Sequence, residues 1–374
     1  MSGAAPRFRP AWAEIDLDAV RHNVRTIVVA AGGAEVCAVV KADGYGHGSV
    51  RVARAALDAG ASGLAVALVE EGIVLREAGI DAPVLLLSEP PDDAASEVVA
   101  QELTPTVYTA AGIEALGAAV ADASLAVHLK VDTGMHRVGA DPADAVALAR
   151  LIHDHPSLEL AAVWTHFAVA DDPSADEFTA EQRRRFDDAC AAIEAAGVPV
   201  PKRHAANAAG TLYAGATYDL VRPGIAVYGY NPNPDLPTAD LRPVLSLRAR
   251  VSHVKELDAG ERLSYGLRYA LPVRSVVATV PLGYADGVPR RLGEVGGEVL
   301  VGGRRCPIAG TVTMDQLLVD CGPGASVAVG DEVVLLGEQE GERITADDWA
   351  RPLGTISYEI LCSIGPRVPR IEVP

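Results

Sequence analysis

Short apolar runs alternate with segments of helical periodicity between residues 36 and 222. Polar loops follow the runs, and stretches such as 49–60, 141–155 and 174–197 carry apolar residues at helical spacing. Strands that are apolar on both faces and alternate with helices are typical of parallel βα units. The pattern repeats eight times, with apolar runs at residues 36–40, 63–68, 83–88, 104–108, 125–131, 158–166, 202–207 and 218–222.

Eight βα units predict an α/β fold built around a (β/α)8 TIM-like barrel, which needs about 200–250 residues. A doubly wound open sheet would also contain alternating strands and helices. No GxGxxG motif follows any of the runs, so a dinucleotide-binding sheet has little support.

The periodicity changes at residues 231–243, where repeated prolines cannot continue a helix or a central strand. Beyond this segment the apolar runs are short and are separated by Gly, Asp and Pro. We therefore predict a (β/α)8 barrel domain at 14–240 and a mainly-β C-terminal domain at 241–374. The N-terminal segment 1–13 is expected to join the C-terminal domain, because it begins the strand-like stretch AWAEIDL.

Composition narrows the class of protein. The chain has 374 residues and a formal net charge of −18, which argues against nucleic acid and against an anionic membrane surface as partners. No apolar run is long enough to span a bilayer, and the N-terminus lacks a secretory signal. The five cysteines are scattered without CxxC spacing. We expect a cytoplasmic protein with reduced thiols and no metal site.

Candidate chemistry lies where the apolar runs end, because catalytic groups of such barrels lie at the C-terminal ends of the strands. A lone histidine or arginine there is more often structural. Here several such groups are expected to converge on one rim: Lys41, Lys130, Arg137, His166, His204, Asn207 and Arg222.

Lys41 is the most informative of these residues. A lysine held beside other cations has a lowered pKa, and its neutral amine can attack a carbonyl group. This chemistry suits a Schiff base with a substrate or with pyridoxal 5'-phosphate (PLP). The glycines after Lys41 let the backbone pass close to a flat ring. Gly224 and Ile225 would offer backbone N–H groups to a phosphate at the start of a short helix, although the same motif also forms ordinary turns.

The motif AVVKADGYGHG at 38–48 resembles the PLP-attachment signature of the alanine racemase family. Further motifs match in the family's order: WAEIDLDAVRHN, KVDTGMHRVG, HAAN, VRPGIAVYG, LSYG, PLGYADG and MDQ. The resemblance covers nearly the whole chain. It implies a PLP-dependent racemase that interconverts L- and D-alanine and supplies D-alanine for peptidoglycan.

The resemblance also implies roles for particular residues. Lys41 would hold PLP and act as one base, and Tyr265 as the second base on the opposite face of Cα. Tyr265 would reach the active site of a partner subunit, which implies a homodimer with shared sites. Tyrosine is a poor base at neutral pH unless its phenolate is stabilised, and a chain from Tyr265 through His166 to the cationic Arg222 would do this.

Other roles follow from the same resemblance. Lys130 matches a lysine that is carbamylated in some members, and an ordinary salt bridge is the alternative. The remaining matches are to residues that bind PLP, bind the substrate or line its access corridor: Tyr45, His166, Asn207, Arg222, Gly224, Ile225 and Tyr358 for PLP; Arg137, Met314 and Asp315 for substrate; Tyr284 and Asp286 for the corridor.

Three positions depart from the common pattern. Ala208 stands where many members have a phosphate-binding serine, Thr311 where an arginine is frequent, and Thr313 where a smaller residue is common. These departures leave open a racemase for serine or a broader set. A PLP-dependent decarboxylase would need a catalytic cysteine, for which Cys362 is the candidate. A PLP carrier would be a single barrel, which the second domain and Tyr265 argue against.

Overall fold

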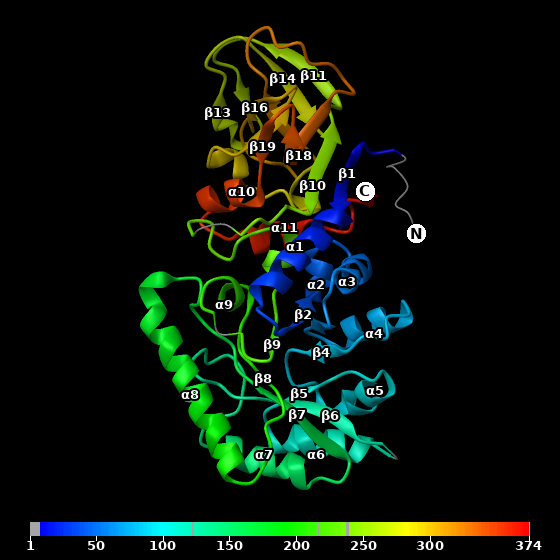
Figure 1. Cartoon of the computed structure of the whole chain (residues 1–374). Coiled ribbons are helices and arrows are strands. Elements are labelled where there is room, and N and C mark those ends of the chain that lie inside the picture. Colours follow the sequence, from blue (N-terminus) through cyan, green and yellow to red (C-terminus); the bar gives the residue numbers. More distant parts are fainter. Residues whose placement is uncertain (1–7, 122, 216, 237–238, 374) are drawn as a thin grey trace. The chain divides into compact units, whose positions relative to one another are not determined.

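The computed structural model describes residues 8–121, 123–215, 217–236 and 239–373 (Figure 1). Residues 1–7 of the predicted N-terminal segment therefore lie outside the described residues. The chain forms two compact units, neither of which is a continuous stretch of sequence. We call them the barrel unit (Val20–Gly44 and Ser49–Arg242) and the β unit (Met1–Ala19, Tyr45–Gly48 and Pro243–Pro374).

Parallel strands form the centre of the barrel unit, in the orders β4-β3-β2-β9 and β5-β6-β7-β8. The two sheets join at a parallel bridge between Leu85 and Thr104, and Asp219 donates its backbone N–H to Arg203 across the other seam at 3.0 Å. The predicted (β/α)8 barrel is therefore confirmed. Its strands are β2 (Glu35–Val39), β3 (Gly63–Val66), β4 (Val84–Leu86), β5 (Thr106–Val107), β6 (Leu125–Lys130), β7 (Leu158–Trp164), β8 (Arg203–His204) and β9 (Leu220–Val221).

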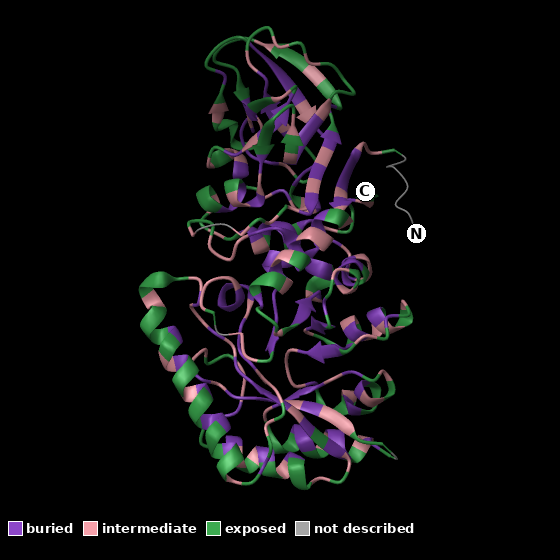
Figure 2. Cartoon of the chain, viewed as in Figure 1, coloured by how far each residue is buried: buried purple, intermediate pink, exposed green. Residues whose placement is uncertain are grey.

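The strands read as continuous apolar runs because both of their faces are covered. β3 and β4 are buried along their whole length (Figure 2). The predicted helix at 141–155 begins later, at Ala145, because Asp141 accepts the N–H of Ala143 in a preceding turn. The helices are α1 (Leu17–Ala30), α2 (Lys41–Tyr45), α3 (Ser49–Asp58), α4 (Val69–Glu77), α5 (Ala95–Ala100), α6 (Ala110–Ala119), α7 (Ala145–Asp154), α8 (Asp176–Ala195) and α9 (Ala208–Leu212), with 3-10 turns η1 (Asp92–Ala94), η2 (Pro173–Ala175) and η3 (Ile225–Tyr228).

The β unit is mainly strands, as predicted, and its largest sheet has the order β16-β15-β18-β10-β1-β20. β1, from the start of the chain, pairs antiparallel with β10 and parallel with β20. The smaller sheets are β11-β14-β17 and β12-β13. The strands are β1 (Ala11–Asp16), β10 (Leu245–Arg250), β11 (His253–Leu257), β12 (Arg262–Leu263), β13 (Tyr269–Ala270), β14 (Ser275–Val280), β15 (Glu298–Val301), β16 (Arg304–Pro307), β17 (Leu317–Asp320), β18 (Glu332–Gln339), β19 (Glu342–Ile344) and β20 (Arg370–Val373).

Short helices punctuate the β unit. The sequence TADDWA starts a helix because the Thr345 hydroxyl accepts the N–H of Asp348, while the Asp348 carboxylate accepts the N–H of Thr345. The helical elements are α10 (Ala346–Leu353), α11 (Ser357–Ser363), η4 (Tyr265–Leu267), η5 (Tyr284–Asp286) and η6 (Leu292–Glu294). Across the described residues of both units, every helix is too short or too polar to cross a membrane.

Candidate active site

Lys41 lies just beyond the C-terminal end of β2, where the turn α2 begins. The backbone of Ala42, Asp43 and Gly44 is left-handed, with φ of 53°, 50° and 61°. Residues other than glycine rarely adopt this conformation, because Cβ then approaches the carbonyl oxygen. Strained backbone of this kind clusters at functional sites, so the turn itself marks Lys41 as a candidate functional residue.

Carboxylates hold this strained turn. Glu71 on α4 accepts the backbone N–H of Ala42 through Oε1 at 2.6 Å, and that of Ala67 through Oε2 at 2.8 Å. Asp43 accepts the N–H of Ser49 at 2.9 Å. Glu71 could not be found from the sequence, because its role depends on a contact across the fold and nothing in the sequence distinguishes it from its neighbour Glu70.

Arg222 follows β9 and is only 2% exposed. Its Nη1 lies 2.5 Å from Nδ1 of His204, and its Nη2 donates to the carbonyl oxygens of Thr165 and Ala205 at 2.8 and 2.9 Å. The guanidinium carbon lies 4.4 Å from the ring centroid of Trp164. Burial lowers the pKa of Arg222 to about 9, so the side chain stays cationic at neutral pH.

His166 follows β7, and its Nδ1 lies 3.4 Å from Nη2 of Arg222. Arginine can only donate, so this nitrogen accepts and Nε2 carries the proton. Burial, together with the charges of Arg222 and Lys130, holds the pKa of His166 well below its usual value. His166 is therefore a neutral imidazole. By the same logic His204 donates from Nε2 to Nδ1 of His128, at 3.0 Å.

Lys130 ends β6 and is 3% exposed. Its Nζ lies 4.3 Å from the ring centroid of Trp164. Burial and the charges of Arg222 and Arg137 lower the pKa of Lys130 to about 7, against the opposing charge of Asp132. The ordinary salt bridge that the sequence left open is not formed with any residue that the structure describes.

Arg137 lies in the loop after β6, where Asp132 accepts the backbone N–H groups of Gly134 and His136 at 3.0 and 3.1 Å. The Arg137 side chain is exposed, and its charge lowers the pKa of both Lys130 and His166. In the sequence, Arg137 is distinguished by its motif alone. In the structure, Arg137 follows a turn whose shape is fixed by the Asp132 carboxylate.

Gln182 on α8 joins this loop to His166. It is fully buried, and its Nε2 donates to the Thr133 hydroxyl at 3.3 Å and to the His166 carbonyl at 3.1 Å. Its Oε1 accepts the N–H of Ala168 at 2.9 Å. A buried glutamine within a polar helix segment gives no sequence signal, so this residue was also missed.

Buried donors without acceptors remain at the same end of the barrel. Nε of Arg222 is buried and has no hydrogen-bond partner within the described chain. The backbone N–H groups of Gly224 and Ile225 are buried and donate to no described residue. Asn207 caps α9 by accepting the N–H of Gly210 at 2.9 Å, and Ala208 is 5% exposed beside it. Buried unpaired donors are costly, so this region fits a ligand rich in acceptors.

Two of the expected phosphate-binding residues lie together in the β unit. The rings of Tyr45 and Tyr358 have centroids 6.1 Å apart. Gly46 fits tightly beside them, since a Cβ there would lie 2.8 Å from the carbonyl oxygen of Leu361. Burial, with Cys362 nearby, raises the pKa of Tyr45 above its usual value. Cys362 itself is exposed on α11.

Tyr265 begins η4 and is 72% exposed. The preceding Ser264 has φ 61° and donates its hydroxyl to the carbonyl of Thr311 at 2.5 Å. Met314 is also exposed. The departures at 311 and 313 have local partners, since Thr311 donates to Glu294 at 3.2 Å and Thr313 donates to the Gln316 carbonyl at 2.8 Å.

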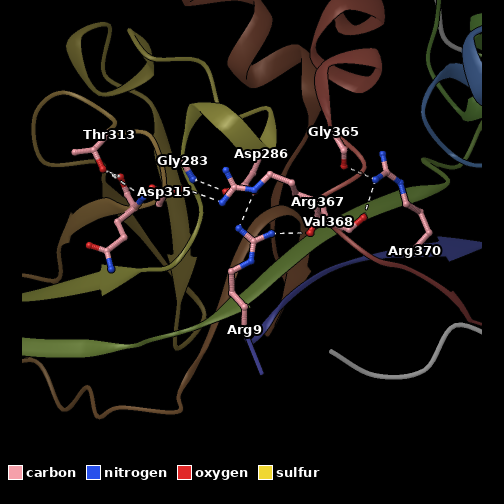
Figure 3. Close-up of polar contacts among 10 residues, drawn as sticks. Arg9, Gly283, Asp286, Thr313, Asp315, Gly365, Arg367, Val368 and Arg370 are labelled. Carbon is pink, nitrogen blue, oxygen red and sulfur yellow. Dashed lines mark hydrogen bonds and ion pairs between the residues drawn. The ribbon is translucent and has the colours of Figure 1, made fainter. Parts of the chain in front are cut away.

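Tyr284 and Asp286, expected in an access corridor, differ in exposure. Tyr284 is 41% exposed, whereas Asp286 is fully buried. The Asp286 carboxylate is turned into the β unit and lies 2.7 Å from Arg9 and 3.4 Å from Arg367 (Figure 3). Nothing in the sequence indicated that this carboxylate would be buried within the β unit and paired with two arginines.

Comparison with known proteins agrees with the geometry. The family models for the N-terminal and C-terminal domains of alanine racemase match residues 15–232 and 244–372. The alanine racemase of Symbiobacterium thermophilum is 47% identical over 367 residues, covering 97% of each chain. That of Nostoc sp. is 44% identical, covering 97% of this chain and 96% of the relative.

Solved structures agree as well. The crystal structure of alanine racemase from D-cycloserine producing Streptomyces lavendulae has a TM-score of 0.93 at 39% identity, covering 99% of this chain and 98% of that one. Alanine racemase from Streptomyces coelicolor A3(2) has a TM-score of 0.91 at 41% identity, covering 97% of this chain and 98% of that one. The chain belongs to the alanine racemase family.

Proposed function

We propose that this protein interconverts L-alanine and D-alanine with PLP as its cofactor, using Lys41 and Tyr265 as bases on opposite faces of Cα. The observation that carries the proposal is the set of basic side chains at one end of the barrel, Lys41, Lys130 and Arg222, beside a neutral His166. The family membership supports alanine as the substrate.

The donors without acceptors fit PLP. The Gly224 and Ile225 N–H groups suit its phosphate. The Tyr45 and Tyr358 hydroxyls are proposed for the same group on the family resemblance alone. Nε of Arg222, which is buried without a partner in the described chain, suits the pyridine nitrogen. Lys41 would hold the cofactor covalently, and Asn207 and Ala208 lie on the phosphate side. When bound, PLP withdraws electrons from Cα and makes its proton acidic enough to leave.

Arg222 also bears on the type of reaction. Its pKa of about 9 means that it donates a hydrogen bond without giving up its proton, so an acceptor facing Nε stays unprotonated. An unprotonated ring nitrogen is a weaker electron sink than one paired with an aspartate. With PLP bound, charge at Cα would be less delocalised, and quick return of the proton by Lys41 or Tyr265 would favour racemisation over transamination.

His166 supports Tyr265 as the second base. Because Nδ1 of His166 accepts from Arg222, the proton on Nε2 is available to a phenolate oxygen. Lys41 moves the Cα proton on one face and Tyr265 on the other. Arg137 is proposed to bind the substrate carboxylate, with Met314 and Asp315 beside the methyl group.

We propose a homodimer in which Tyr265 acts in the site of the partner subunit. The exposure of several large apolar side chains in the β unit supports this: Tyr265, Leu267, Tyr284, Met314 and Ile356. Large apolar side chains exposed on a protein surface can mark the place where a partner chain binds. The proposed role, cytoplasmic supply of D-alanine for peptidoglycan, rests on the family alone.

The decisive experiment is circular dichroism of L-alanine incubated with the holoenzyme, beside a Tyr265→Phe variant. The signal should decay to zero with the wild type and persist with the variant, which should still hold PLP. A wild type that holds PLP but leaves L-alanine untouched would contradict the proposed substrate, and serine would be tested next. Full activity of Tyr265→Phe would contradict the second base.

A further inference from the structure

Asp286 is the centre of a polar network in the β unit. Its Oδ1 lies 2.7 Å from Nη1 of Arg9 and 3.4 Å from Nε of Arg367, and its Oδ2 accepts the N–H of Gly283 at 3.0 Å (Figure 3). The side chain is fully buried. Both carboxylate oxygens are therefore engaged, and Asp286 is fixed in one orientation.

Arg367 connects this buried anchor to the surface. Its Nη2 lies 2.7 Å from Oδ1 of Asp315, while Arg9 donates to the Arg367 carbonyl at 2.7 Å. Exposure rises along the chain of contacts, from 0% at Asp286 to 46% at Arg367 and 58% at Asp315. The guanidinium of Arg367 is thus held from inside by Asp286, and its outer end is set against Asp315.

The backbone around Asp315 is already fixed by the turn that carries Asp286. Tyr284 and Ala285 donate their N–H groups to the carbonyls of Thr313 and Met314, each at 3.0 Å. Gly283 packs so closely that a Cβ would lie 2.3 Å from either carbonyl oxygen. With the backbone held, the orientation of the Asp315 carboxylate depends on its side-chain partner, Arg367.

We propose that Arg367, anchored by Asp286 and Arg9, is a positioning residue that sets substrate affinity by orienting and neutralising the Asp315 carboxylate. This inference rests on the proposed place of Met314 and Asp315 beside the substrate. A carboxylate without a cation would repel the carboxylate of alanine. The Asp315 carboxylate would also be free to rotate toward the proposed position of the substrate methyl group and to draw water with it.

The test is steady-state kinetics of Arg367→Gln in the holoenzyme. KM for both L- and D-alanine should rise about fivefold, the effect expected of a half-exposed ion pair, with kcat changed by less than about twofold. Arg367→Lys should restore most of the affinity. Arg274→Gln is the matched control, since this exposed arginine of the same unit pairs with Glu256 at 3.0 Å and should leave both constants unchanged.

A double-mutant cycle with Asp315→Asn separates the outcomes. If Arg367 acts through Asp315, adding Arg367→Gln to Asp315→Asn should cause no further rise in KM. The proposal fails if the two rises multiply, or if Arg367→Gln lowers Tm and kcat and leaves KM intact. If Asp315→Asn alone leaves KM unchanged, Asp315 does not lie in the substrate site. If Asp315→Asn changes KM but Arg367→Gln has the wild-type KM, only the proposed role of Arg367 is wrong.

Discussion

Nη2 of Arg222 and Nδ1 of His166 lie 3.4 Å apart, so a permanent cation fixes which nitrogen of the histidine carries the proton. The same guanidinium fixes His204, which in turn fixes His128. All three histidines are therefore held neutral. Burial, with Arg222 adding to it, lowers the pKa of each below its usual value, to about 3 for His128.

Because these histidines are neutral in the folded protein, the free energy of unfolding should fall as the pH is lowered. In the unfolded chain the three histidines bind protons below about pH 6.5, whereas in the folded protein they stay neutral. The unfolded state then binds more protons, so the free energy of unfolding falls as pH drops from about 7 to about 5. Three protons give a slope approaching about 4 kcal/mol per pH unit.

Denaturant unfolding of the holoenzyme at a series of pH values measures this slope. His128→Gln keeps a polar group beside His204 and should remove one of the three protonation steps, which makes the pH dependence shallower. Equal slopes for the variant and the wild type, or a free energy that does not vary over this range, would contradict neutral histidines in the folded state.

Glu71 is predicted to support activity without touching the substrate. Glu71→Gln replaces one carboxylate oxygen with an NH2 group that cannot accept, so it loses the acceptor either for the N–H of Ala42 or for those of Ala67 and Leu68. The strained turn after Lys41 should relax, with kcat falling at least about tenfold, since a charged hydrogen bond is worth roughly 1.5–3 kcal/mol. Glu70→Gln is the matched control, because Glu70 is exposed on the same helix. Similar kcat values for both variants would refute the role of Glu71.

Ala208→Ser is predicted to strengthen cofactor retention. The new hydroxyl would donate to the phosphate from a position that is 5% exposed, and one added hydrogen bond to a charged group slows PLP loss about tenfold or more. Dialysis followed by absorbance of the remaining PLP measures this. Ala209→Ser, also buried, controls for adding a hydroxyl. If the wild type keeps all its PLP through exhaustive dialysis, the premise of weak retention is wrong.

Lys130 is predicted to carry a carbamate. At a pKa of about 7 roughly half of the amine is neutral at neutral pH. Addition of CO2 then forms an N–C bond and releases one proton, and the product anion would face Arg137. Carbon-13 NMR after incubation with labelled bicarbonate should show a carbamate signal that Lys130→Arg lacks. Lys202→Arg, at an exposed lysine paired with Glu35 at 2.6 Å, should retain it. A signal that survives in Lys130→Arg would assign the modification elsewhere.

Sequence and structure agree most where a residue's role is local. Each of the eight apolar runs overlaps a barrel strand, because strands covered on both faces must be largely apolar. The positions of Lys41, His166 and Arg222 after strands could be predicted, because the end of a strand is visible in the sequence. The protonation states and histidine tautomers at this site could not be predicted, because they depend on burial and on contacts between residues of different strands.

Other features had no local signal. Glu71 and Gln182 look like ordinary helix residues, and their importance comes from backbone groups that the fold brings to them. Asp286 resembles a surface residue of a glycine-rich turn, yet Arg9, far away in the sequence, makes it an internal anchor. Its motif placed Tyr45 near the phosphate, but the packing of residues 45–48 on α11 required the structure.

The interleaving of the two units limits how members of this family can exchange parts. β1 lies between β10 and β20 in the sheet, and the segment Tyr45–Gly48 also belongs to the β unit. A chimera made by one crossover near residue 242 would join a foreign β10 and β20 to a native β1. Every such recombinant has a β1 that does not match its neighbouring strands, so functional hybrids need β1, residues 45–48 and the C-terminal part of the β unit inherited together.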